Sequence, residues 1–231
     1  MSAPSLTTDT ESWQPKAIVF DLLTALLDSW TLWDASTPSG SPSEGRPWRH
    51  RYLEITFSLP GGVYVPYEDC VRQAARDVGL PPSAPEALLA SWEGLQAWPE
   101  VAKVLPALRE RGYKLGVVTN CSRQQGHIAI RNAEKCAAGG DGQDFTFDAA
   151  ITAEESGFYK PVEQAYNAII TKMGLEANDM LFVAGSPGDV QGATDAGMRV
   201  VWHNKAKLPK KGEAVASRES STLDDALRGF L

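Results

Sequence analysis

The sequence predicts an α/β fold: a Rossmann-like parallel sheet core with helices on both faces, plus a small helical cap domain inserted after the first strand. Two observations support this prediction. Short apolar runs alternate along the chain with stretches of helical pattern, which indicates parallel strands joined by crossover helices. This alternation is interrupted between residues 29 and 98, and an insertion of that size is most simply a separate helical unit.

Several apolar runs are predicted to be buried strands, because uninterrupted apolar residues are typical of strands covered on both faces. They are Lys16–Asp21, Lys114–Thr119, Met180–Ala184 and Arg199–His203, with Phe147–Ile151 as a weaker fifth. Helices are predicted between them, at residues 100–111, 161–173 and 190–196. Each of these helical stretches is followed by a glycine, the residue that commonly ends a helix.

A chain of 231 residues suits one core and a smaller inserted domain. Inside the insertion, residues 68–78 and 85–95 have a helical pattern, whereas STPSGSPSEGRP at 36–47 predicts a mobile loop. The predicted division is a disordered polar lead at 1–15, a core at 16–28 and 99–231, and a cap at 29–98.

Composition narrows the class of protein. The chain is 43% hydrophobic, carries a net charge of −7 and has no long basic run, which argues against nucleic-acid binding. The short basic stretch at 205–211 is interpreted as a solvated loop. Nothing approaches the roughly 18 apolar residues of a membrane span. Three cysteines without CxxC spacing, and no apolar signal core, predict a cytoplasmic protein without a zinc site.

Polar side chains follow the predicted strands and precede one helix. They are Asp21, Thr119, Asn120, Lys160, Ser186 and Asp189. Ligands of parallel α/β sheets bind beyond the carboxyl ends of the strands. A single Asp at a strand end is more often a cap or turn residue, but the convergence of a carboxylate, a hydroxyl and amide pair, a lysine and a second carboxylate favours a functional site.

This arrangement resembles the haloacid dehalogenase superfamily from about Lys16 to Leu231, and most closely its type II 2-haloacid dehalogenases. The four superfamily motifs correspond to Asp21, Thr119, Lys160 and Asp189. Trp48-Arg49 with Leu53-Glu54 is similar to the arginine segment of the dehalogenase cap, and Thr119-Asn120-Cys121-Ser122 is similar to a Ser-Asn-Gly-Ser motif. Tyr159-Lys160-Pro161 followed by Tyr166 matches a third segment.

The resemblance implies a hydrolase that acts on a small acid. Asp21 would displace a halide from carbon and form an ester, which water activated by Asp189 would hydrolyse. Lys160 would keep Asp21 ionised. Arg49 and Asn120 would receive the halide, and Thr119 with backbone donors would hold the substrate carboxylate. Ser186 and Tyr166 are also assigned to substrate binding.

The residue two places after Asp21 separates two chemistries. Phosphatases of the superfamily carry an acid there to protonate the departing alkoxide, whereas a halide leaves without a proton. Leu23 occupies that place, and Gly185 occupies that of the first acid in the last loop of the phosphatases. The resemblance therefore implies no required metal, although two carboxylates would still allow weak magnesium binding. It also allows a homodimer.

The chain departs from the dehalogenase pattern near the nucleophile and in the last loop. Thr24 comes one residue before the usual threonine, whose place is taken by Ala25, and Ala184 and Ser186 replace a Ser and an Asn. Two alternatives therefore stay open: a magnesium-dependent phosphatase that uses Asp21, and a catalytically silent binding protein on this fold. Cys121 is interpreted as a structural thiol.

Overall fold

The computed structural model describes residues 13–139 and 144–231. Their core is a six-stranded sheet in which all neighbouring strands are parallel, in the order β3-β2-β1-β4-β5-β6. The strands are β1 (Ala17–Asp21), β2 (Lys114–Thr119), β3 (Ala149–Thr152), β4 (Met180–Ala184), β5 (Arg199–His203) and β6 (Arg218–Ser220). The strand order reverses beside β1, so the carboxyl end of β1 lies at the switch point where such sheets bind ligands.

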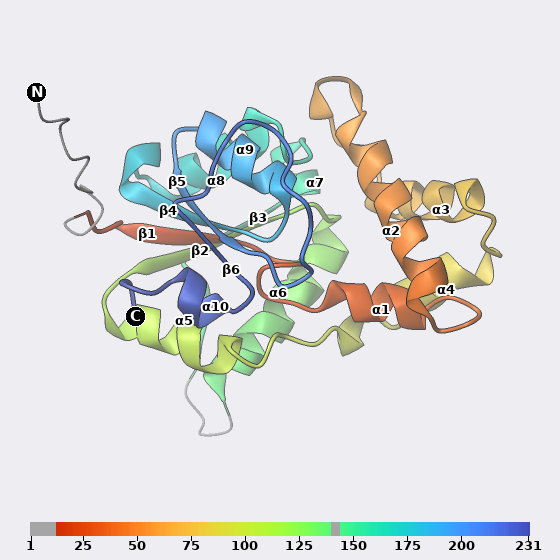
Figure 1. The fold of residues 1–231 in the computed structure, drawn as a ribbon, viewed down its shortest axis with the longest axis horizontal. Helices are drawn as coiled ribbons and strands as arrows, with labels where there is room; N and C mark the ends of the chain where they lie inside the picture. Colours follow the sequence, from red (N-terminus) through yellow and green to blue (C-terminus); the bar gives the residue numbers. More distant parts are fainter. Residues whose placement is uncertain (1–12, 140–143) are drawn as a thin grey trace, which may run out of the picture.

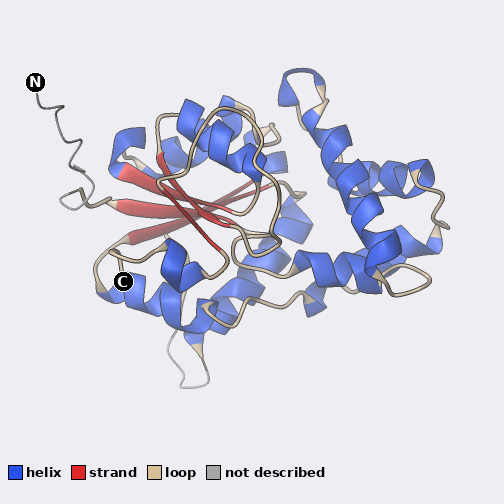
Figure 2. Cartoon of the chain, in the orientation of Figure 1, coloured by secondary structure: helices blue, strands red, loops and turns tan. Residues whose placement is uncertain are grey.

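Helices cover both faces of the sheet, as predicted (Figures 1 and 2). Ile18 and Phe20 of β1 pack with one apolar cluster, whereas Ala17 and Val19 pack with the other. The first cluster includes α5 (Val101–Glu110), α6 (Arg123–Ala138) and α10 (Leu223–Ala226). The second includes α8 (Glu163–Met173) and α9 (Pro187–Asp195). The short α7 (Ala153–Ser156) follows β3, and the 3-10 turn Ala177–Asp179 precedes β4.

The inserted segment forms a helical unit to one side of the sheet, at the right of Figure 1. It contains α1 (Ser29–Ala35), α2 (Pro42–Phe57), α3 (Tyr67–Asp77) and α4 (Ser83–Ala90), with 3-10 turns at Pro60–Gly62 and Trp92–Gly94. The two connections to the core lie side by side: Leu27 and Ala97 form an antiparallel bridge, and Trp98 N donates to Leu26 O at 2.9 Å. This pairing supports the predicted cap boundaries near 28 and 98, which remain a prediction.

The predicted loop at 36–47 is wrong from residue 42 onward, where α2 begins. Pro42 occupies the first helical turn, where its missing N–H costs no hydrogen bond. Gly45 lets α2 lie against α1, because a Cβ at this position would come within 2.3 Å of Asp34 Oδ1. Proline and glycine, which the sequence interpretation took as loop signals, here start the helix and allow its close packing.

Two tryptophans, Trp92 and Trp98, join the helical unit to the core. Trp48 and Trp92 are fully buried. Trp92 Nε1 donates to Gln125 O of α6 at 2.8 Å, and Trp98 Nε1 donates to Thr24 O at 3.0 Å. These bonds fix the helical unit close to the loop that follows β1.

The N-terminal prediction falls partly outside the described residues. Of the predicted disordered lead, residues 1–12 are not described, while Trp13 packs edge-on against Phe230 with 6.4 Å between ring centres. None of the helices within 13–139 and 144–231 is long and apolar enough to cross a membrane.

Candidate active site

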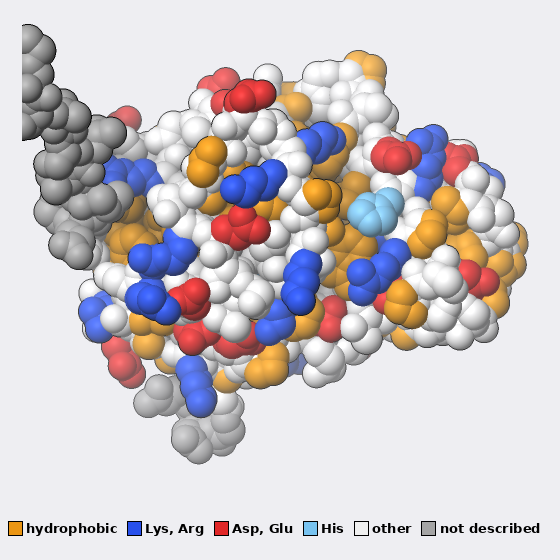
Figure 3. Space-filling view, viewed as in Figure 1, with side chains coloured by type: hydrophobic (Ala, Val, Ile, Leu, Met, Phe, Trp, Pro, Cys, Tyr) orange, Lys and Arg blue, Asp and Glu red, His pale blue; other side chains and the backbone are white. Residues whose placement is uncertain are grey.

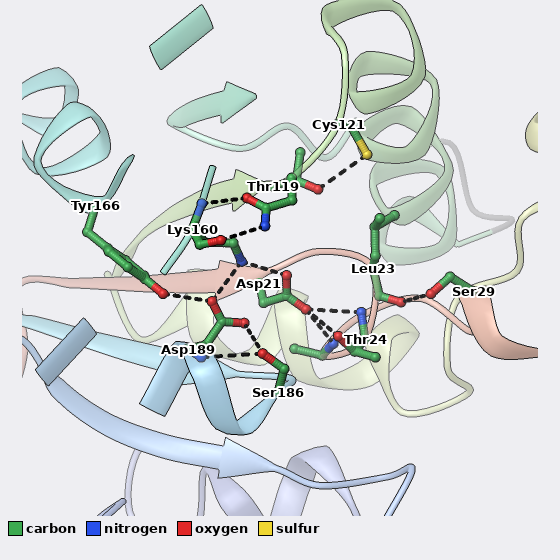
Figure 4. Close-up of polar contacts among 12 residues, drawn as sticks. Asp21, Leu23, Thr24, Ser29, Thr119, Cys121, Lys160, Tyr166, Ser186 and Asp189 are labelled. Atoms are coloured by element: carbon green, nitrogen blue, oxygen red, sulfur yellow. Dashed lines mark hydrogen bonds and ion pairs between the residues drawn. The ribbon is translucent and has the colours of Figure 1, made fainter. Parts of the chain in front are cut away.

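Asp21 lies at the carboxyl end of β1 and is only 5% exposed. Its Oδ1 lies 2.7 Å from Lys160 Nζ. Its Oδ2 accepts hydrogen bonds from Thr24 N at 3.0 Å, Thr24 Oγ1 at 2.7 Å and Ala25 N at 3.3 Å (Figure 4). Burial opposes ionisation, but the charge of Lys160 and the hydrogen bonds outweigh it and hold the pKa of Asp21 below its ordinary value. Asp21 is therefore a carboxylate at neutral pH.

Lys160 lies between two buried carboxylates. Its Nζ is 2.7 Å from Asp21 Oδ1 and 3.0 Å from Asp189 Oδ1. Burial disfavours the ammonium, but the two negative charges outweigh this effect and raise the pKa of Lys160. Asn120 holds the backbone on both sides, since Lys160 N donates to Asn120 Oδ1 at 2.7 Å and Asn120 Nδ2 donates to Lys160 O at 2.9 Å. The lysine is thus charged and fixed in position.

Asp189 is held in the first turn of α9, of which Ser186 is the N-cap. Tyr166 OH donates to Asp189 Oδ1 at 2.8 Å, and Ser186 Oγ donates to Asp189 Oδ2 at 3.1 Å. Burial, and then the charge of Asp21, raise the pKa of Asp189 more than Lys160 and Tyr166 lower it. The pKa values of the two carboxylates are therefore shifted in opposite directions, a pattern typical of acid–base sites.

Arg49 reaches the site from α2 and is 5% exposed. Its guanidinium carbon lies 4.0 Å from the centre of the Trp30 ring, and its Nη1 is buried without a hydrogen-bond partner. Burial is the main reason that its pKa falls to about 10, which leaves it charged at neutral pH. No ion pair found in the described part of the chain includes Arg49. A buried charge without a partner is costly, so this guanidinium is suited to receive an anion.

A small cavity of about 50 Å³ connects these groups. Its lining comes from both the core and the helical unit, and consists of Asp21, Leu23, Thr24, Trp30, Arg49, Tyr52, Leu53, Phe57, Asn120, Lys160, Pro161, Ser186, Gly188, Asp189 and Leu208. One water needs about 10–15 Å³ of such space, so the cavity holds roughly four water-sized groups. The space suits the reacting end of a small molecule.

Most of the predicted site residues meet at this cavity. Asp21, Lys160, Asp189, Ser186 and Arg49 line it. Tyr166 does not line the cavity but donates a hydrogen bond to Asp189, which does. Asn120 also lines the cavity, although its amide is bonded to the backbone of Lys160.

Thr119 is the exception. It is buried, its hydroxyl contacts Cys121 Sγ at 3.6 Å, and it is not among the cavity-lining residues. The expectation that it meets the other site residues is therefore not met, because the β2 terminus directs its side chain toward Cys121 (Figure 4). Burial raises the pKa of the Cys121 thiol to about 12, in keeping with its predicted structural role.

Sequence reasoning missed two residues of the site. Thr24 is the first: Ala25 stands where a threonine is usual, yet the hydroxyl of Thr24 donates to Asp21. The signal was the spacing itself, because a side chain three residues after a strand end reaches back across a turn. Trp30 is the second: it lines the cavity, and the guanidinium of Arg49 lies over its ring. Nothing in the local sequence pairs these two residues.

Comparison with known proteins identifies the family. The sequence profile of haloacid dehalogenase-like hydrolases matches residues 48–197, well over half of the chain. The chain belongs to this family. Haloacetate dehalogenase H-2 of Moraxella sp. (strain B) is 28% identical, over 82% of this chain and 86% of its own length. A phosphatase of Mycobacterium tuberculosis (strain CDC 1551 / Oshkosh) is 29% identical, over 71% of this chain and 72% of its own.

A solved structure of an L-2-haloacid dehalogenase agrees with this assignment. It is 27% identical and superposes with a TM-score of 0.77, covering 93% of this chain and 98% of its own. The protein is thus a haloacid dehalogenase-like hydrolase whose dehalogenase relatives match it along most of their length. The relatives also include a phosphatase, so membership of the family does not by itself distinguish a halide leaving group from an alkoxide.

The residues of this hydrolase do not fit the magnesium site expected of a phosphatase. Gly185 has no room for an acidic side chain, because a Cβ there would lie 2.5 Å from both Asp21 Oδ2 and Ala25 N. Lys160 Nζ lies between the two available carboxylates. The described residues include no group of three or more His, Cys, Asp or Glu placed to hold a metal ion.

Proposed function

We propose that this hydrolase cleaves the carbon–halogen bond of a small 2-halo acid, with Asp21 as nucleophile and Asp189 as general base. The observation that carries the proposal is the unpartnered guanidinium of Arg49, buried at the same small cavity as Asp21. Leu23 lines this cavity where a phosphatase would carry its proton donor. A site with a free buried cation and no leaving-group acid suits an anion that departs without a proton.

In the first step, one oxygen of Asp21 attacks the halogen-bearing carbon. Oδ1 is the better nucleophile, because it accepts one hydrogen bond while Oδ2 accepts three. The new C–O bond forms as the C–X bond breaks, and the halide leaves with the bonding pair. Arg49, and the remaining N–H of Asn120, receive the halide. Trp30 supports Arg49 through its ring.

In the second step, water attacks the ester carbon of Asp21, and Asp189 takes the proton. The raised pKa of Asp189 brings it closer to that of an efficient general base. The ester carbonyl is Oδ2, and the N–H groups of Thr24 and Ala25 that already donate to it stabilise the negative charge that develops there. When the intermediate collapses, the bond between the Asp21 carbonyl carbon and the substrate oxygen breaks, and Asp189 returns its proton to that oxygen, which releases a 2-hydroxy acid. Loss of the other water proton to solvent restores the Asp21 carboxylate.

The remaining site residues position these groups. Ser186 and Tyr166 orient Asp189 through their hydrogen bonds. Ser186 also lines the cavity, and a bond from its hydroxyl to the substrate carboxylate would replace the one to Asp189. The direct contact predicted between Thr119 and that carboxylate is not part of the proposal, because Thr119 does not line the cavity. A cytoplasmic location, a metal-independent reaction and a homodimer belong to the same proposal.

Phosphate-ester hydrolysis is the second candidate, because one relative is named a phosphatase. Leu23 and the crowded Gly185 count against it. A panel of phosphate monoesters with and without magnesium tests it, and turnover that depends strictly on magnesium would reverse the ranking. A silent binding protein is disfavoured because Asp21, Lys160 and Asp189 lie within hydrogen-bonding reach of one another through Lys160.

The decisive experiment follows halide release and the path of oxygen. The wild type is incubated with chloro- and bromoacetate and 2-bromopropanoate, and free halide is measured. In a single turnover in H₂¹⁸O, the label is expected in the peptide that contains Asp21 and not in the product, because water attacks the ester carbon of Asp21. Label that appears first in the hydroxy acid would mean direct attack by water, and the absence of halide release would reject the function.

A further inference from the structure

A second and larger cavity, of about 620 Å³, lies beside the reaction cavity. The two share the side chains of Leu53, Phe57, Ser186 and Leu208. The lining of the second cavity, called here the outer chamber, consists of these four with His50, Glu54, Ser58, Pro187, Pro209, Lys210 and Lys211. The two cavities therefore adjoin at these four residues.

The outer chamber lies between the cap and the loop that follows β5. One wall is the carboxyl-terminal part of α2, and the other is the loop at 204–212, on the side of the core that faces α2 (Figure 1). This loop is held in place, since Asn204 Nδ2 donates to Leu208 O at 2.9 Å and Leu208 N donates to Asn204 Oδ1 at 2.7 Å. Leu208, which lines both cavities, is therefore held in place where they adjoin.

The chemistry of the outer chamber matches an apolar chain attached to an anion. Leu53, Phe57, Pro187, Leu208 and Pro209 supply an apolar lining. Lys210 and Lys211 lie at its exposed rim, and Lys211 Nζ is 5.3 Å from the centre of the Phe57 ring. Figure 3 shows hydrophobic side chains bordered by Lys and Arg where the helical unit meets the core. The two lysines favour anions near the rim, which also includes Glu54, and the apolar lining favours burial of hydrocarbon.

We propose that the outer chamber takes the alkyl chain of the substrate, so that the hydrolase acts on 2-halo acids with chains of several carbons. This inference rests on the proposed dehalogenation. A reaction cavity of about 50 Å³ accommodates the carboxylate, the halogen and the carbon that joins them. Further methylenes extend past Leu208 and Phe57 into the outer chamber, where they lose contact with water.

The test is a series of 2-bromo acids from bromoacetate to 2-bromooctanoate. If burial of each methylene contributes its usual free energy, kcat/KM is expected to rise about two- to fourfold per added carbon until the chamber is filled. Values that stay flat or fall with chain length, while bromoacetate is turned over, would overturn the inference and leave the proposed dehalogenation intact.

A substitution in the outer chamber sharpens the test. Ser58→Trp fills the chamber from the end of α2, because Ser58 lines it and does not line the reaction cavity. We expect kcat/KM for 2-bromooctanoate to fall at least tenfold and that for bromoacetate to stay within twofold. Ser43→Trp is the matched control, an exposed serine at the other end of α2. Equal loss on both substrates, with an unchanged melting temperature, would contradict the assignment.

Binding of unreactive acids tests, without turnover, whether the outer chamber binds an alkyl chain. Octanoate is expected to bind the wild type at least tenfold more tightly than acetate, measured by calorimetry, and Ser58→Trp is expected to remove this difference. Equal affinities in the wild type would overturn the inference. If halide is released from none of the acids but octanoate still binds preferentially, the proposed function fails and the apolar subsite stands.

Discussion

The core supplies the site with charged groups that are paired with one another, whereas the cap supplies a charged group that has no partner within the residues that the structure describes. At the sheet edge, Asp21, Lys160 and Asp189 satisfy one another through short contacts before any substrate arrives. On the cap, Arg49 is equally buried but has an unpartnered Nη1. The paired groups are held in place before the substrate binds, whereas the unpaired guanidinium of Arg49 is available to bind an anion. Substitutions in the two groups test this difference between paired and unpaired charges.

Replacement of the nucleophile should have the largest effect. Asp21→Asn keeps the shape of the side chain but removes the attacking carboxylate, so halide release is expected to fall at least about 10⁴-fold. Asp179→Asn, at an exposed ion pair with Lys16, is the control and should stay within twofold. Residual turnover above a thousandth of the wild-type rate would show that another group attacks the substrate.

Replacement of Lys160, the cation that Asp21 and Asp189 share, tests how tightly the charged groups of the core are coupled. Lys160→Met leaves two buried carboxylates without their partner, and the free energy of unfolding in urea is expected to fall by about 3–5 kcal/mol. Lys16→Met breaks an exposed pair and should cost about 1 kcal/mol or less. Equal small losses in the two variants would mean that the sheet-edge cluster is not the tightly coupled unit described above.

Arg49, which has no ion-pair partner in 13–139 and 144–231, should show the opposite of Lys160: its loss should lower activity but not stability. Arg49→Met should lower kcat/KM about 100-fold, in line with the loss of a charge-assisted contact to the departing anion, without lowering the free energy of unfolding. Bromide should raise the melting temperature of the wild type and not that of this variant. Arg46→Met, an exposed arginine on the same helix, is the control. Destabilisation by Arg49→Met would indicate a structural arginine.

The smallest effect concerns pH. Tyr166→Phe removes a donor that lowers the pKa of Asp189. Since Asp189 acts as a base only when ionised, its higher pKa should move the acidic limb of the kcat profile to higher pH, with an activity loss of about fivefold at neutral pH. Tyr113→Phe, whose hydroxyl contacts Gln14 outside the site, should leave the profile unchanged. A shift toward lower pH would exclude Asp189 as the group that titrates.

Most of the core followed from the sequence. The boundaries predicted for β2, β4 and β5 coincide with those observed, because short uninterrupted apolar runs are typical of parallel strands that are buried on both faces. β6 was not predicted, since its three residues are partly exposed and lie at the edge of the sheet. The start of α2 was missed because Pro42 and Gly45 resemble loop residues until the packing against α1 is known.

The sequence was sufficient to predict the fold class and the resemblance to the family, and it selected Asp21, Lys160 and Asp189 as candidate site residues. Asp21 and Asp189 follow parallel strands, whose carboxyl ends meet at one edge of the sheet. The tertiary structure was needed to show that Thr24 donates to Asp21, that Thr119 does not line the cavity and that Arg49 lies over the Trp30 ring. These outcomes depend on side-chain directions and on how the cap docks. The unpartnered Arg49, which supports the proposed function, belongs to this second group: sequence placed an arginine in the cap, but burial and the lack of a partner are properties of the assembled site.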